Sequence, residues 1–221
     1  MTNDTRQEIF KAHVYGKTAA EISAVTGVDI TEITALLAIS GDEIAEKKAY
    51  LEQHKPSIKT MMALKDVGGK AHFGIDISAW NGAVDMAKVK AAGKDFVFIR
   101  SGYGNTAAYP SQIDKRFGEN VRNAKAAGIS WGVYHYMYAI TTAAAQAEAR
   151  AFVAQLNAVK PIPHLCLLDI EESSQTKLDA EQGRALVKAF MDVLESAGYY
   201  GAIYTFDSYA QKLGNDFCKK Y

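Results

Sequence analysis

Two hydrophobic patterns divide the chain near residue 70. In residues 1–55, apolar positions recur three and four residues apart, which predicts amphipathic helices. From residue 73 onward, short and nearly continuous apolar runs alternate with helical stretches, as in strands that are buried on both faces of a parallel sheet. We therefore expect a small helical module at 1–55, a linker or bridging helix at 56–72, and an α/β domain at 73–221.

The helical module contains a helix-turn-helix-like segment at residues 18–37. Thr18 and Glu21 have the spacing of a capping box, and Asp29 can cap the helix that follows. A further helix is expected at 43–54. Two interpretations are open for the segment, namely DNA binding and a three- or four-helix module that packs in the same way.

The charge of the module favours the packing interpretation. The expected recognition helix, residues 29–40, contains no Lys or Arg. Residues 1–70 contain nine Lys+Arg against ten Asp+Glu, so nothing would offset the repulsion between these acidic side chains and DNA phosphates.

The second part of the chain predicts five strands, each followed by a helix. The predicted strands are residues 73–78, 96–100, 130–138, 165–170 and 201–205. The predicted helices are residues 84–92, 111–127, 142–159, 179–197 and 207–219. This regular alternation indicates an α/β fold with a parallel sheet that helices cover.

Composition and charge exclude several classes of partner. The 221 residues are 48% hydrophobic and 23% charged, as in ordinary globular proteins. Because 25 Lys+Arg balance 25 Asp+Glu, the chain has no overall basic field for nucleic acid or anionic lipid. No apolar run approaches the ~20 residues that span a bilayer, and the first six residues lack the basic region and apolar core of a secretory signal. We expect no nucleic-acid and no membrane partner.

The sequence also predicts no cofactor and no metal. It lacks HExxH, paired-cysteine, GxGxxG and GxxxxGK[ST] patterns. Cys166 lies inside an apolar run, which is typical of a packing residue.

Three acidic residues stand where predicted strands end, which is where parallel α/β folds gather their functional side chains. Asp169 and Glu171 are two positions apart, so in a strand they point to the same side with Cα atoms roughly 6.6 Å apart. Two carboxylates held this close cannot both ionise freely, and an acid beside a carboxylate is what glycoside cleavage requires. Asp76, from another strand end, strengthens this interpretation over a helix cap with solvated charges.

Aromatic side chains at the same strand ends suit a sugar ligand, because sugar C–H faces stack on rings and hydroxyls bond to their polar tips. The candidate substrate-binding residues are Trp80, Arg100, Tyr103, Tyr136, Tyr138 and Tyr204. Packing is the alternative role for several of these rings and the favoured one for Tyr134. His135 has the opposite parity to its neighbours, so we expect it to face a helix.

Residues 73–221 resemble the glycoside hydrolase family 25 lysozymes, which are N-acetylmuramidases of phages, bacteria and some fungi. The matching segments, in family order, are residues 74–82, 84–85, 89–93, 96–104, 126–129, 132–136 and 168–171, with Asp114, Phe117 and Asn120. The resemblance implies a modified TIM-like β/α barrel that cleaves the β-1,4 bond between N-acetylmuramic acid and N-acetylglucosamine in bacterial peptidoglycan, with net retention. By motif, Glu171 would be the general acid, Asp169 would stabilise or position the reacting centre, and Asp76 would complete the acidic cluster.

One departure from the family pattern concerns the number of strands. The sequence predicts five, whereas the family barrel has eight. Three explanations are open: a fragment of a longer enzyme, which we favour; self-association or a second chain that supplies the remaining strands; and an inactive relative whose N-terminal helices cover the open side.

Two functions of different classes follow from these expectations. The first is a peptidoglycan muramidase of the phage-endolysin type, released from the host cytoplasm through a holin or carried in the virion, and acting on the cell wall. The alternative is a non-catalytic glycan-binding or structural phage protein on a lysozyme scaffold. A chitinase is disfavoured, because Leu165 and Leu167 stand where its first two motif aspartates would lie.

Overall fold

The computed structural model describes residues 1–14, 16–53, 72–162 and 164–221. The chain divides into two compact units, Met1–Lys55 and Pro56–Tyr221, and each is described by itself. The linker that we predict at 56–72 lies outside the described residues, apart from its last position. No helix in the described ranges is both long and apolar enough to cross a bilayer.

The first unit is helical, as predicted. Its helices are α1 (Asn3–Val14), α2 (Ala19–Thr26), α3 (Ile30–Ile39) and α4 (Gly41–Gln53). The predicted capping box is present at the start of α2, where Thr18 and Glu21 cap each other. Asp29 accepts a hydrogen bond from the backbone N–H of Thr31 and so begins α3. The fully buried apolar side chains of this small core are Ile9, Phe10, Ile22 and Ile33.

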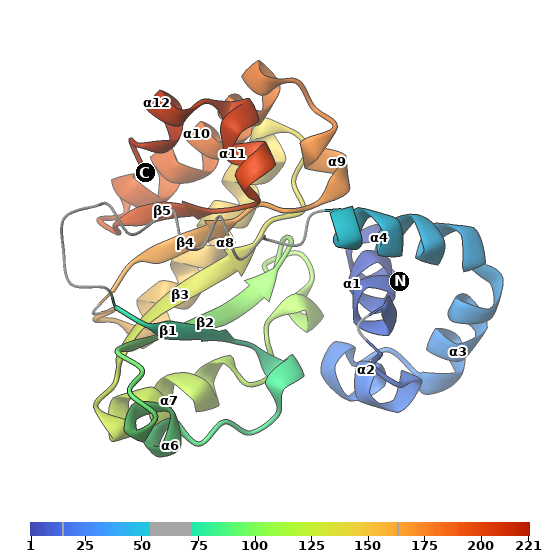
Figure 1. Cartoon of the computed structure of the whole chain (residues 1–221), viewed down its shortest axis with the longest axis horizontal. Coiled ribbons are helices and arrows are strands. Elements are labelled where there is room, and N and C mark those ends of the chain that lie inside the picture. The colour runs from blue at the N-terminus through green and yellow to red at the C-terminus, as the bar shows by residue number, and fades with distance from the viewer. Residues whose placement is uncertain (15, 54–71, 163) are drawn as a thin grey trace. The chain divides into compact units, whose positions relative to one another are not determined.

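The second unit is built on a parallel sheet, so the predicted α/β class is confirmed. Its described residues form five strands in chain order, β1 (Gly74–Ile77), β2 (Phe96–Tyr103), β3 (Ser130–Tyr136), β4 (Cys166–Asp169) and β5 (Gly201–Tyr204). The main helices between and after them are α6 (Met86–Ala91), α7 (Phe117–Ala127), α8 (Thr142–Val159), α10 (Ala180–Ser196) and α11 (Asp207–Leu213). The shorter elements are η2 (Ala79–Asn81), η3 (Pro110–Gln112), α9 (Ser173–Thr176) and α12 (Asn215–Cys218). In Figure 1 the strands lie side by side from β1 to β5.

One face of the sheet packs against the helices and forms the core of the unit. Alternate strand residues such as Ile99, Val133 and Leu168 are fully buried there. His135 lies on this face with no exposed surface, near the rings of Phe152 and Phe190. The sequence prediction that His135 faces a helix is therefore confirmed.

Two helices differ from the prediction for local physical reasons. The last predicted helix is broken into α11 and α12 by Gly214, whose φ of 98° lies in the left-handed region that a side chain disfavours. The helix predicted from residue 111 begins only at Phe117. The residues before it form a 3-10 turn and a loop that Asp114 holds through its own hydrogen bonds.

Gly132 marks a tight approach on the opposite face of the sheet. A Cβ atom at this position would meet the backbone carbonyl of Leu165 and come within 2.5 Å of the Phe98 ring. The Leu165 carbonyl accepts a hydrogen bond from the backbone N–H of Val133 on β3 at 3.2 Å, so it cannot move without disturbing the sheet.

We expect Gly132→Ala to lower the free energy of unfolding by about 1–3 kcal/mol, as overpacking of a close contact does. Urea denaturation measures the change. Gly118→Ala is the control, since its Cβ would meet only the Arg122 guanidinium at an ordinary 3.5 Å and alanine favours a helix. Equal stability of the two variants would contradict the tight approach.

Candidate active site

The strand register aligns the predicted site residues in rows on the face opposite the helix-packed core. Tyr103, Tyr136, Asp169 and Tyr204 are register partners across β2, β3, β4 and β5. Two residues before Tyr136 on β3, Tyr134 is the register partner of Arg100 on β2. Partners in a parallel sheet point to the same side, so the row of four places one carboxyl group between tyrosine rings at the carboxyl end of the sheet.

A bulge in β2 decides which way Tyr103 points. Strict alternation would put Arg100 and Tyr103 on opposite faces, because they are three positions apart. The register instead shifts between Arg100 and Gly102, and the Arg100 guanidinium carbon lies 5.6 Å from the centre of the Tyr103 ring. The bulge therefore brings both side chains to the site, which is a common use of bulges.

Burial and nearby charges shift the pKa values of Tyr134 and Tyr136. Burial raises the pKa of Tyr134 well above its ordinary value, Arg100 opposes this shift, and the charges of Asp76 and Asp169 add to it. Burial likewise raises the pKa of Tyr136, with further contributions from nearby acids that include Glu171 and Asp169. In the sheet, Asp76 lies on β1 and Asp169 on β4 with β2 and β3 between them, and Glu171 follows the end of β4.

The three acids differ in exposure. Asp169, the last residue of β4, is only 6% exposed. Glu171 lies two positions beyond Asp169 and is half-buried, whereas Asp76 on β1 is exposed. A half-buried carboxyl group at a strand end can both contact a ligand and keep an environment that differs from bulk water.

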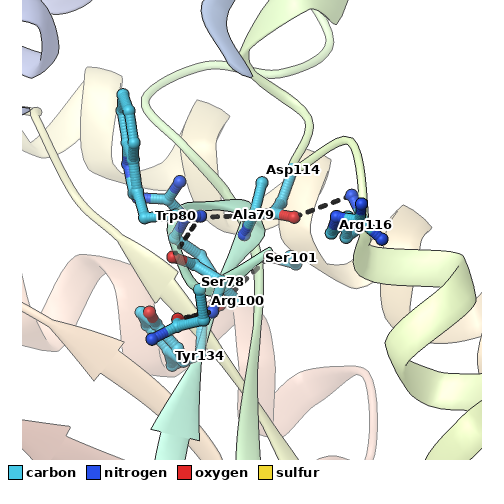
Figure 2. Close-up of polar contacts among 9 residues, drawn as sticks. Ser78, Ala79, Trp80, Arg100, Ser101, Asp114, Arg116 and Tyr134 are labelled. Atoms are coloured by element: carbon cyan, nitrogen blue, oxygen red, sulfur yellow. Dashed lines mark hydrogen bonds and ion pairs between the residues drawn. The ribbon is translucent and has the colours of Figure 1, made fainter. Parts of the chain in front are cut away.

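The buried Asp114 side chain forms hydrogen bonds both to the turn after β1 and to β2. Its Oδ2 accepts hydrogen bonds from the Arg100 Nε at 3.0 Å and from the Ala79 backbone N–H at 2.9 Å. Its Oδ1 accepts from the Arg116 backbone N–H at 2.9 Å. Figure 2 shows Asp114 between Arg116 and the turn that carries Ala79 and Trp80. Arg100, a predicted substrate-binding residue, is thus 4% exposed and held in an ion pair.

Trp80 is placed by the turn that Asp114 holds. It belongs to η2, and its backbone N–H donates to the Ser78 hydroxyl, which caps the turn. Its side chain is partly exposed. Local capping therefore fixes the backbone of Trp80 in η2, three residues after the end of β1, the strand that carries Asp76.

The predicted tyrosines fall into two groups by exposure. Tyr103, Tyr136 and Tyr138 form a buried cluster, in which the ring of Tyr138 lies 5.9 Å from that of Tyr103 and 5.4 Å from that of Tyr136. Tyr204 is 48% exposed. Among these four, Tyr204 has the surface that direct stacking on a ligand requires, and the other three are packed against one another.

Sequence reasoning assigned no role to two buried residues beside the acids. Glu172 is 2% exposed, and its Oε1 accepts a hydrogen bond from the Tyr136 hydroxyl at 2.7 Å. Gln175 is fully buried, and its side chain bonds three backbone groups. The Glu-x-x-Gln spacing of a helix start was the available signal. In the described part of the chain, this site included, no three His, Cys, Asp or Glu side chains gather as metal ligands would.

Comparison with known proteins gives a consistent family match. The family model for "Glycosyl hydrolases family 25" matches residues 75–221. "Lysozyme M1" of Streptomyces globisporus is 40% identical over 63 residues, which are 28% of this chain and 20% of that protein. "Autolytic lysozyme" of Clostridium acetobutylicum is 29% identical over 136 residues, which are 62% of this chain and 39% of that protein.

A solved structure agrees with these matches. The bacterial lysozyme from Streptomyces coelicolor superposes with a TM-score of 0.52 and 28% sequence identity, over 65% of this chain and 67% of that chain. The curated relatives are longer than the matched region: the chain spans 20% of one and 39% of the other.

Proposed function

The chain belongs to glycosyl hydrolase family 25, and from that premise we propose that it is a peptidoglycan hydrolase. It cleaves the β-1,4 bond between N-acetylmuramic acid and N-acetylglucosamine. The row of Tyr136, Asp169 and Tyr204 across three strands, with Glu171 two positions beyond Asp169, is the observation that carries the proposal.

The chemistry assigns a different task to each acid. Glu171, half-buried at the strand end, gives its proton to the glycosidic oxygen as the bond to the anomeric carbon breaks. The Asp169 carboxylate stabilises the positive charge that develops at that carbon, and Asp76 completes the acidic cluster. Water adds to the anomeric carbon and its remaining proton returns to Glu171, with net retention of configuration.

Substrate binding uses the two partly open rings of the site. Trp80 and Tyr204 stack on sugar C–H faces, which is how aromatic rings hold carbohydrate. The buried Tyr103, Tyr136 and Tyr138 form the wall behind them, and Arg100 keeps Tyr103 in place through the contact of its guanidinium with the ring.

The sheet is, in this proposal, a segment of a modified TIM-like β/α barrel. Strands in chain order, each followed by a helix, and rows of inward side chains support it. Residues 73–221 form the hydrolase domain, and residues 1–55 form a separate helical module that targets, regulates or assembles the enzyme. A second copy or chain that completes the barrel, and a phage-type lysin released by a holin or carried in a virion, also stay predictions.

Product analysis tests the function. Purified protein is incubated with peptidoglycan, and the new reducing ends are converted to sugar alcohols with borohydride and identified by mass spectrometry. We expect muramitol ends to accumulate with time. Glucosaminitol ends would contradict the bond assignment. Glycan binding without any new ends would favour the non-catalytic scaffold over the hydrolase.

A further inference from the structure

Gln175 joins two loops that meet at the carboxyl end of the sheet. Its Nε2 donates hydrogen bonds to the carbonyl oxygens of Met137 at 2.8 Å and Ala139 at 3.1 Å, just after β3. Its Oε1 accepts from the backbone N–H of Glu172 at 3.2 Å, just after β4. The side chain is fully buried, so water cannot replace these bonds if they are lost.

Glu172 is consequently held at both of its ends. Gln175 holds its backbone, and the Tyr136 hydroxyl holds its carboxylate at 2.7 Å. On the other side of Glu171, the backbone N–H of Ile170 donates to the Tyr204 carbonyl at 3.0 Å. Glu171 is therefore a single residue between two anchored neighbours.

We propose that Gln175 is a positioning residue that sets the orientation of Glu171 by locking the loop after β4 to the loop after β3. The proposal rests on the proposed function, in which Glu171 is the general acid. An acid must lie within hydrogen-bond reach of the glycosidic oxygen, and a loop free to shift would carry Glu171 away from it.

An amide side chain is required for this role. It must accept one hydrogen bond and donate two, which Gln does with one planar group. A glutamate carboxylate would turn acceptor oxygens toward the two carbonyls, and a methionine would fill the space without bonding any of the three groups.

Gln182 provides a matched control within the same chain. It occupies the same capping-box position in α10 that Gln175 occupies in α9, and its Oε1 accepts from the Asp179 backbone N–H at 3.2 Å. Its side chain is exposed and, among the described residues, makes no hydrogen bond to another loop. A variant at Gln182 therefore removes a helix-capping hydrogen bond but no hydrogen bond between two loops.

The experiment compares Gln175→Met, Gln175→Glu and Gln182→Met in the full chain. The substrate is a soluble tetrasaccharide of alternating N-acetylglucosamine and N-acetylmuramic acid. Displacement of a catalytic group by about 1 Å costs about 100-fold, so we expect that fall in kcat for both Gln175 variants. KM should stay within about twofold of wild type, because the sugar-stacking residues are untouched. Gln182→Met should match wild type in both constants.

A second readout does not depend on activity. Hydrogen–deuterium exchange with mass spectrometry should show faster exchange in residues 137–141 and 171–176 together in Gln175→Met, and in neither segment in Gln182→Met. A Gln175→Met protein with wild-type kcat, or with unchanged exchange in either segment, would overturn the positioning role. Equal kcat loss in Gln182→Met would do the same.

The two readouts distinguish failure of the Gln175 proposal from failure of the proposed hydrolase function. If the wild-type protein cleaves no substrate, the hydrolase proposal fails. The exchange experiment then still decides whether Gln175 locks the two loops, and unchanged exchange would reject the clamp itself.

Discussion

Glu171→Gln is expected to lower kcat on peptidoglycan by about 1,000-fold, within the range that a general acid contributes. Glutamine has nearly the same shape as glutamic acid but has no acidic proton to give to the leaving oxygen. Because Glu171 is half-buried at a strand end rather than in the core, the substitution should leave the melting temperature close to that of wild type. The release of reducing ends measures the rate.

Glu181→Gln is the matched control, since Glu181 is exposed in the first turn of α10. Its kcat should stay within about twofold of wild type, as is usual for surface substitutions. Turnover at the wild-type rate by Glu171→Gln would show that another group donates the proton. A large loss of folded protein would show instead that Glu171 is structural.

Asp114→Asn is expected to lower the free energy of unfolding by about 3 kcal/mol, because it removes one partner of a buried ion pair. Arg100 is 4% exposed, so its charge would stay in the interior without a counter-charge. The asparagine NH2 group would also face a backbone N–H group that now donates a hydrogen bond to the carboxylate. Two donors would then meet, and that hydrogen bond would be lost. Urea denaturation followed by tryptophan fluorescence measures the change, and Trp80 and Trp131, the two tryptophans of the sequence, both belong to the second unit.

Asp192→Asn tests whether burial is the cause. Asp192 pairs with Lys188 at 2.6 Å, but both side chains are more than half exposed. Pairs of this kind contribute little to stability, so the urea midpoint should not change measurably. An equal shift for the two variants would contradict the role assigned to burial of the Arg100–Asp114 pair.

The start of α2 and the side of the sheet that His135 faces could be predicted because they depend on local spacing. A capping box needs Thr18 and Glu21 three positions apart, and strand parity needs only alternation. The strand–helix alternation likewise indicated the parallel sheet. These features involve neighbours in sequence, so no knowledge of distant contacts was required.

The roles of Arg100, Asp114 and Gln175 could not be predicted in the same way. Arg100 and Asp114 are 14 positions apart, and Gln175 bonds carbonyl groups 36 and 38 positions away. No local pattern states that these groups meet. The β2 bulge also depends on pairing with β3, and it lets Arg100 and Tyr103, three positions apart, both lie at the site.

Local sequence patterns predicted the helical and α/β parts, the strand ends at which acids and rings stand, and the residues that resemble a lysozyme family. They could do so because hydrophobic periodicity, caps and motif order are properties of short segments. Only the folded chain shows that Tyr136, Asp169 and Tyr204 form one row, that Asp114 and Gln175 hydrogen-bond neighbouring loops, and which rings are buried. These features depend on strand register and on packing between segments far apart in the chain, which local composition does not encode.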